Sequence, residues 1–177
     1  MGAQGNYSLE QDEPTLVHSN EISAVLLGDV FHVVDTGLLD RHNITHLLLV
    51  ASKCSLPPGS ASRQVLTVPL AENGTTDLTV AGRSEAAENT PTPTAAARLD
   101  QCLEFIEEAW GSGGRILIAC SNGNNRAAVV SLAWLMRQRR WGVQDSLRHL
   151  QELRPSIRPP PQYLSQLKTL EPRLQEA

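Results

Sequence analysis

Hydrophobic residues along this chain fall into two kinds of segment, namely short continuous runs and longer stretches with helical spacing. The short runs cover residues 24–27, 44–50, 64–70 and 115–119. Apolar runs of this length are typical of buried strands. The longer stretches cover residues 31–42, 95–110, 126–137, 143–153 and 162–170. Strands and helices therefore alternate, which predicts an α/β domain with a central, mostly parallel sheet flanked by helices.

Two of the expected helices differ in how their apolar side chains are distributed. In residues 95–110 the apolar positions recur at the helical period and form one stripe, made of Leu99, Cys102, Leu103, Ile106 and Ala109. This pattern predicts an amphipathic helix that packs one face on the sheet, with Cys102 in the core. Residues 126–137 are apolar on nearly every side, which predicts a helix buried inside the domain.

Two polar segments complete the expected organisation. Residues 1–18 are polar and contain glycine, and we expect a flexible tail there. Residues 19–177 then form a single domain, because 177 residues with 41% hydrophobic content suffice for one core. Within it, residues 72–94 are polar and carry two glycines and two prolines, so we predict a loop insertion.

Composition excludes several classes of protein. A net charge of −4 argues against general nucleic-acid binding, which requires a clustered basic excess. The three cysteines, Cys54, Cys102 and Cys120, form no Cys-x-x-Cys pair, so we expect neither a disulfide framework nor a zinc site. No apolar run of 18 residues is present, and we expect no transmembrane segment. These features favour a cytoplasmic protein, with the nucleus as an alternative.

The most informative chemistry lies where the run at 115–119 meets the helix at 126–137. Cys120 and Arg126 flank this junction, and Gly123 lies between them. A loop that closes onto a helix N-terminus directs backbone N–H groups toward an anion, and arginine binds two phosphate oxygens at once. Thiols at helix N-termini and beside cations ionise readily. The junction predicts a phosphate site with a nucleophilic thiol, although Cys120 as a small buried hydrophobe is the alternative.

Residues 119–127 read Ala-Cys-Ser-Asn-Gly-Asn-Asn-Arg-Ala. This segment resembles the signature His-Cys-x-x-Gly-x-x-Arg-Ser/Thr of the atypical dual-specificity phosphatases, which are cysteine-dependent protein phosphatases. The resemblance continues in the sequence Ser-Leu-Ala-Trp-Leu-Met at 131–136 and in Arg-Pro-Ser-Ile at 154–157, and it begins near residue 21. It therefore covers most of the chain.

The resemblance implies roles for particular residues. Cys120 would be the nucleophile, and the phosphate would be held by Arg126 with the loop residues Ser121, Asn122, Gly123, Asn124 and Asn125. Glu72, in the sequence Val-Pro-Leu-Ala-Glu at 68–72, stands where the family has its general acid Asp. Asp77 is a second candidate acid, and Glu72 as an ordinary surface carboxylate is the alternative to a catalytic role. The family requires no metal or other cofactor.

Three departures from the family's pattern, at positions 119, 127 and 72, leave two hypotheses. Ala119 replaces the His that organises the loop, and Ala127 replaces the Ser/Thr that hydrogen-bonds the sulfur. The first hypothesis is a slow phosphatase acting on phosphotyrosine, phosphoserine or phosphothreonine through a phosphocysteine intermediate. The second is a pseudophosphatase that binds phosphorylated proteins, including components of a kinase pathway, without turnover. Redox sensing by an exposed, ionised Cys120 could accompany either.

Overall fold

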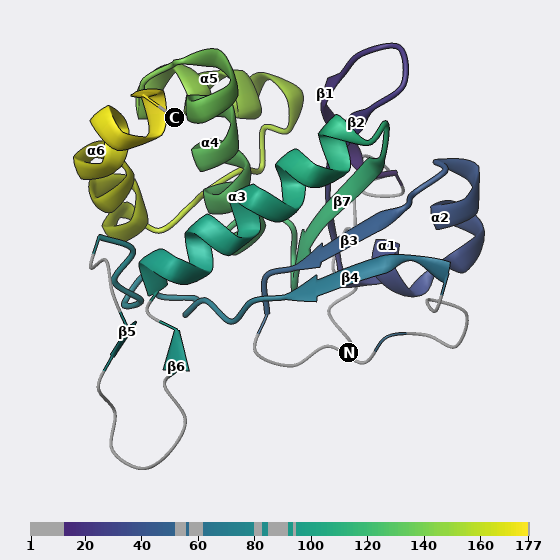
Figure 1. The fold of residues 1–177 in the computed structure, drawn as a ribbon, viewed down its shortest axis with the longest axis horizontal. Helices are drawn as coiled ribbons and strands as arrows, with labels where there is room; N and C mark the ends of the chain where they lie inside the picture. Colours follow the sequence, from purple (N-terminus) through teal and green to yellow (C-terminus); the bar gives the residue numbers. More distant parts are fainter. Residues whose placement is uncertain are drawn as a thin grey trace, which may run out of the picture.

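A five-stranded sheet forms the centre of the molecule (Figure 1). The computed structural model describes residues 13–51, 56, 62–79, 83–84, 92–93 and 95–176. The strand order is β1 (Thr15–Ser19), β2 (Ala24–Asp29), β7 (Arg115–Cys120), β3 (His46–Leu49) and β4 (Gln64–Thr67). All neighbours pair in parallel except β1, which is antiparallel to β2. The predicted α/β domain with a mostly parallel sheet is confirmed.

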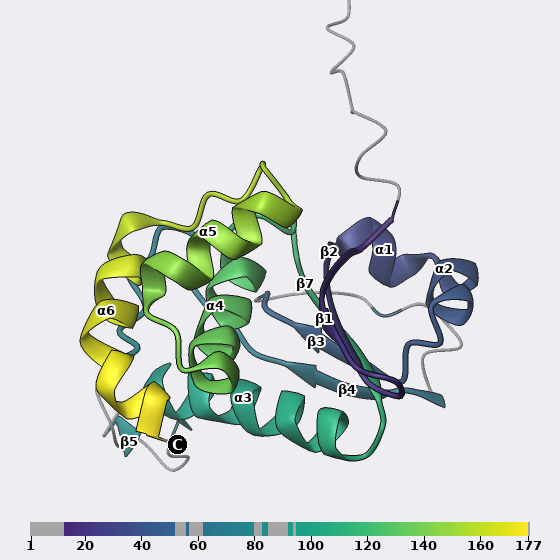
Figure 2. The same cartoon turned by 90° about the horizontal axis from the view of Figure 1, so that it is seen from above.

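Helices cover both faces of this sheet (Figures 1 and 2). One face carries α3 (Ala95–Gly111), α4 (Arg126–Arg139), α5 (Val143–Leu153) and α6 (Pro161–Glu176). The other face carries the short helices α1 (Val30–Val34) and α2 (Thr36–Arg41). Among the described helices, none has both the length and the apolar character of a membrane span.

The central strand β7 supplies side chains to both cores. Ile116 and Ile118 face the larger core with α3 to α6, whereas Leu117 and Ala119 face the smaller core with α1 and α2. This alternation follows from the two-residue period of a strand. Helix α4 lies within the larger core, and every residue from Arg126 to Met136 is buried. Both helix predictions, the buried α4 and the amphipathic α3, are therefore correct.

The segment expected to be one helix, residues 31–42, is two helices. Asp35 separates them, because it is the C-cap of α1 and the N-cap of α2. Its carboxylate accepts a hydrogen bond from the backbone N–H of Leu38 at 2.9 Å. Aspartate commonly competes with helix continuation in this way.

The expected flexible tail contains a strand in its last part. Residues 15–18 belong to β1, which pairs with β2 along the edge of the sheet and has an irregular register between Leu16 and His18. Only Val17 of this strand is buried, so the segment lacks the apolar run used to predict the other strands. Residues 1–12 lie outside the described part of the chain.

The first part of the predicted loop insertion packs against α6. Leu78 is buried, and its backbone N–H donates to Gln166 Oε1 at 2.6 Å. Tyr163 Oη donates to the carbonyl of Ala71 at 2.7 Å, just before the insertion. Two short strands, β5 (Arg83–Ser84) and β6 (Thr92–Pro93), pair antiparallel. The remainder of the predicted insertion, residues 80–82, 85–91 and 94, falls outside the described residues.

Asp29 at the end of β2 makes the stability of the fold dependent on pH. Its carboxylate caps α1 by accepting from the backbone N–H groups of Phe31 at 2.9 Å and His32 at 3.3 Å. Burial opposes ionisation of Asp29, but the hydrogen bond and charge of His32 and these backbone bonds outweigh it, so its pKa is lowered overall. We expect Asp29→Asn to lower the free energy of unfolding at pH 7 by about 1 kcal/mol.

This difference should be pH-dependent in a defined direction. The difference in free energy of unfolding is fully present above about pH 4, the ordinary pKa of Asp. It disappears as the pH falls through the lower pKa that Asp29 has in the folded state. Urea unfolding of parent and variant between pH 7 and pH 3 measures it. Glu21→Gln, at an exposed position, is the control. A difference that grows on acidification would contradict this assignment.

Candidate active site

The candidate nucleophile lies at the carboxyl end of the central strand. Cys120 is the last residue of β7, between β2 and β3, and its Cα pairs with that of Asp29. Residues 121–125 form the loop, and α4 begins at Arg126. Asn125 is the N-cap of α4 but makes no side-chain capping bond. Ligand sites of open α/β sheets lie at this edge, and the N–H groups of an uncapped helix favour an anion.

The turn of the loop requires a glycine at position 123. Gly123 has φ of +70°, which side-chain-bearing residues rarely adopt. A Cβ atom there would lie 2.8 Å from the carbonyl oxygen of Gly28 and 3.1 Å from Nη2 of Arg154. The loop is therefore packed between the end of β2 and the Arg154 guanidinium, and neither side has space for a methyl group.

Arg126 faces the candidate acid directly. Its guanidinium is buried, and Nη2 lies 2.5 Å from Glu72 Oε1 and also donates to Ser121 Oγ. Ser121 Oγ in turn donates to Glu72 Oε1 at 3.0 Å. The Glu72 side chain is 69% exposed, so this ion pair lies on the solvent side of the loop.

A cavity of about 360 Å³ opens at this ion pair. Its lining comprises Val30, Ala51, Leu70, Ala71, Glu72, Ser121 and Arg126. Cys120 is only 2% exposed and does not contribute to the lining. The structure therefore brings Arg126, Ser121 and Glu72 to the surface of one cavity, with the thiol at the strand end behind them.

The surroundings of Cys120 lack the polar side chains that the signature's His and Ser/Thr would supply. Ala119 and Ala127 are buried and offer the sulfur no polar side-chain atom. Ser131, one turn further along α4, donates to the carbonyl of Ala127 at 3.0 Å and is thus engaged by the helix. Cys120 Sγ donates to Asn122 Oδ1 at 3.8 Å. Asn122 Oδ1 also accepts from the backbone N–H of Asn124 at 3.0 Å.

The inner side of the loop is held by a segment to which the sequence analysis gave no role. Asn124 Oδ1 accepts hydrogen bonds from Arg154 Nε at 2.8 Å and from Ser156 Oγ at 2.9 Å. The carbonyl of Asn124 accepts from the backbone N–H of Arg158 at 3.1 Å. Residues 154–157 were recognised only as part of the family resemblance, and that resemblance was the available signal.

Asp77, the second candidate acid, is not brought into the cavity. Its Oδ1 accepts from the backbone N–H of Thr79 at 2.8 Å and from Thr79 Oγ1 at 2.7 Å. These bonds direct the carboxylate into its own local turn. Glu72 is therefore the candidate acid that the structure places beside Arg126.

The two described cysteines have different environments. Cys102 is fully buried on α3, as predicted, and burial raises the pKa of its thiol to about 12. Cys120 is also buried, but it lies at a strand end, where it interacts with the charge of Arg154. Cys54 falls outside the described residues.

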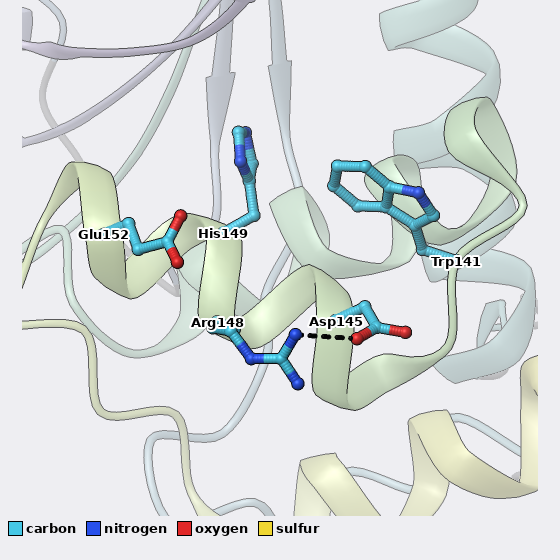
Figure 3. A pocket seen from close by; sticks show the side chains of 5 residues that line it. All are labelled: Trp141, Asp145, Arg148, His149 and Glu152. Carbon is cyan, nitrogen blue, oxygen red and sulfur yellow. Dashed lines mark ion pairs between the residues drawn. The ribbon is translucent and has the colours of Figure 1, made fainter.

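A second cavity, of about 290 Å³, lies over α5 (Figure 3). Its lining comprises Trp141, Asp145, Arg148, His149 and Glu152. Arg148 and Asp145 pair with each other at 3.1 Å, so their charges are mutually compensated. Within the described residues, no cluster of three His, Cys, Asp or Glu side chains is placed to hold a metal ion, here or elsewhere.

The sequence profile described as dual specificity phosphatase, catalytic domain, matches residues 25–173. The chain belongs to this family. Among dual specificity phosphatases and related proteins, protein phosphatase Slingshot homolog 3 of Rattus norvegicus is 48% identical over 65 residues, which are 37% of this chain and 10% of that protein. The chain thus spans about a tenth of that relative's length. Dual specificity protein phosphatase 1 of Arabidopsis thaliana is 27% identical over 167 residues, covering 94% of this chain and 73% of that protein.

Solved structures confirm the dual specificity phosphatase fold. Human DUSP28 superposes with a TM-score of 0.73 and 24% identity, over 92% of this chain and 95% of that chain. Human tyrosine phosphatase-like serine/threonine/tyrosine-interacting protein superposes with a TM-score of 0.72 and 20% identity, over 91% and 97% of the two chains. At these identities the likeness concerns the fold.

Replacing Gly123 with alanine should weaken anion binding by the loop. The new Cβ would collide with the Gly28 carbonyl, so the backbone of the loop must leave its present conformation. We expect affinity for inorganic phosphate, measured by calorimetry, to fall by about tenfold or more, since distorting several charge-assisted hydrogen bonds costs well over 1.4 kcal/mol. Gly111→Ala is the matched control, because a Cβ there meets no atom within 4 Å. Equal phosphate affinity in Gly123→Ala and the parent would refute the requirement.

Proposed function

We propose that the chain is a slow, cysteine-dependent phosphatase of proteins that carry phosphotyrosine, phosphoserine or phosphothreonine. The observation that carries the proposal is the junction itself, where Cys120 and Arg126 flank a left-handed Gly123 at the start of a buried helix. A thiolate there would be held in line with a phosphorus atom whose oxygens contact Arg126 and the loop amides. Membership of the dual specificity phosphatase family supports the same reaction.

The reaction would proceed in two steps. In the first, the Cys120 thiolate forms a bond to phosphorus while the bond to the substrate's oxygen breaks, and Glu72 gives that oxygen a proton. In the second, Glu72 takes a proton from water as the water oxygen attacks phosphorus, which releases phosphate and restores the thiolate. Arg126 and the loop N–H groups stabilise the charge on the phosphoryl oxygens in both steps.

Glu72 has a place in this scheme because of its contact with Arg126. Glu72 Oε1 lies 2.5 Å from Arg126 Nη2, at the position where a phosphate oxygen would bind. An arriving phosphate dianion would replace it, because a dianion gains more than a carboxylate from a buried guanidinium. The displaced carboxyl group would then lie beside the phosphate, where it can transfer a proton to the leaving oxygen.

Two features support a low rate. Ala119 and Ala127 give neither the loop nor the sulfur the polar contacts that the family's His and Ser/Thr provide. Glu72 must also leave Arg126 before phosphate binds. General acid catalysis typically contributes about 10²–10⁴-fold, so imperfect placement of Glu72 would leave an enzyme that prefers good leaving groups.

A pseudophosphatase is the second candidate, and the absence of a hydroxyl at Ala127 favours it. Without this group, hydrolysis of a phosphocysteine loses its assistance, while the loop and Arg126 would still bind phosphate. In that case the protein would bind phosphorylated proteins and regulate a signalling pathway by occupying their phosphorylated sites.

Turnover of a fluorogenic aryl phosphate by the purified protein under reducing conditions tests the first proposal. We expect measurable turnover that Cys120→Ser abolishes, because the hydroxyl is a far poorer nucleophile at neutral pH. Glu72→Gln should reduce turnover, with a larger reduction for a substrate whose leaving group is an alkyl alcohol. Asp77→Asn is the matched control for loss of a nearby carboxylate, and its turnover should equal that of the parent.

The opposite outcome is equally specific. Absence of turnover in the parent, together with phosphopeptide binding that Arg126→Ala removes, would replace the phosphatase with the pseudophosphatase. Turnover that survives in Cys120→Ser would exclude the cysteine mechanism.

A further inference from the structure

Arg154 is a buried arginine beneath the candidate phosphate loop. It follows α5 directly as its C-cap residue, and it is only 5% exposed. Within the described residues, no carboxylate forms an ion pair with it. Arginine stays protonated even when buried, so a full positive charge lies under the loop.

The guanidinium holds the loop through hydrogen bonds to two residues. Arg154 Nε donates to Asn124 Oδ1 at 2.8 Å, and Nη2 donates to the carbonyl of Asn122 at 3.4 Å. Nη2 also lies 3.1 Å from the position that a Cβ of Gly123 would occupy. The planar group therefore lies against the inner side of the turn at 122–124.

Bonds from the neighbouring elements fix Arg154 and Asn124 in place. Arg154 Nη1 donates to Thr15 Oγ1 on β1 at 3.4 Å, which ties the guanidinium to the edge strand. Ser156 Oγ donates to Asn124 Oδ1 at 2.9 Å, and the Arg158 N–H donates to the Asn124 carbonyl at 3.1 Å. Asn124 thus receives three hydrogen bonds from residues 154–158.

The charge of Arg154 acts on the ends of β2 and β7, where Asp29 and Cys120 lie next to each other. Burial lowers the pKa of the Arg154 guanidinium, whereas the charges of Asp29 and Cys120 act to raise it. Asn122 connects the two groups, because its carbonyl accepts from Arg154 Nη2 at 3.4 Å and its Oδ1 accepts from Cys120 Sγ at 3.8 Å. The other charged or titratable groups on the elements around Cys120 are Asp29 and His32 from β2 and α1, Glu72 from the loop after β4, and Arg126 from α4.

We propose that Arg154, through Asn124, is the positioning residue of the phosphate loop, and that its buried charge stabilises the Cys120 thiolate. The inference rests on the proposed phosphate-binding function of this loop. In this chain the pair provides what Ala119 and Ala127 cannot, namely contacts that organise the loop and a favourable field at the sulfur. Arg154 touches the loop and does not line the cavity, so it acts through the loop.

The test separates the positive charge from the hydrogen bonds. Arg154→Met removes both, Arg154→Lys keeps the charge but loses the planar fork, and Asn124→Ala removes the acceptor while Arg154 stays. Arg148→Met, at an exposed position on α5, is the matched control. Two quantities are measured for each folded variant, namely the pH profile of Cys120 alkylation by iodoacetamide, followed by mass spectrometry, and the calorimetric affinity for inorganic phosphate.

Each variant has its own expected result. In Arg154→Met the alkylation profile moves to higher pH by about one unit, because a nearby opposite charge typically shifts titration by one unit or more. Arg154→Lys keeps the parent profile. Asn124→Ala also keeps the profile but binds phosphate about fivefold more weakly, in proportion to one lost hydrogen bond of about 1 kcal/mol. Arg148→Met matches the parent in both measurements.

An unchanged profile and an unchanged phosphate affinity in folded Arg154→Met would overturn the proposal. If that variant fails to fold, Asn124→Ala decides the positioning role alone, and parent-like phosphate affinity overturns it. Neither measurement depends on turnover. A parent protein without phosphatase activity would therefore refute the proposed reaction while leaving the role of Arg154 to be judged on its own results.

Discussion

The close approach of two backbone segments at Gly123 and Gly28 is the constraint on which the site depends. β2 and β7 run in parallel in adjacent positions, and the loop after β7 folds back until Gly123 touches the end of β2. Only a residue without a side chain fits between the Gly28 carbonyl and the Arg154 guanidinium. This tight turn keeps the loop short, and Cys120 and Arg126 lie at its two ends.

The sequence predicted those elements whose burial produces a regular pattern. β7 and α5 were placed almost to the residue, because an apolar run with Gly114 before it and a periodic segment after Gly142 mark their boundaries. The break at Asp35 was missed because a single capping bond causes it and leaves the apolar spacing intact. β1 was missed because an edge strand with one buried residue has no run to detect.

The residues of the candidate site also divide into those that the sequence could reveal and those that only the folded structure shows. Cys120, Gly123 and Arg126 could be recognised because their spacing is that of the family signature. Arg154 could not, because an arginine in a polar segment is ordinarily a surface residue, and only the folded chain shows it buried. Asn124 was expected only as one of the phosphate-loop residues, because the three bonds that it receives come from a segment 30 to 34 residues later.

Glu72 can be regarded as a ligand of Arg126 that is covalently attached to its own binding site. Such a group has an effective concentration set by its tether, which for short flexible connections is in the millimolar range. Any anion that enters the cavity therefore competes with a carboxylate that never diffuses away. Singly charged anions resemble the resident group and gain little by replacing it, whereas a phosphate monoester brings a second charge. In the proposed reaction the contact at 2.5 Å would therefore favour doubly charged ligands over singly charged ones before Cys120 reacts.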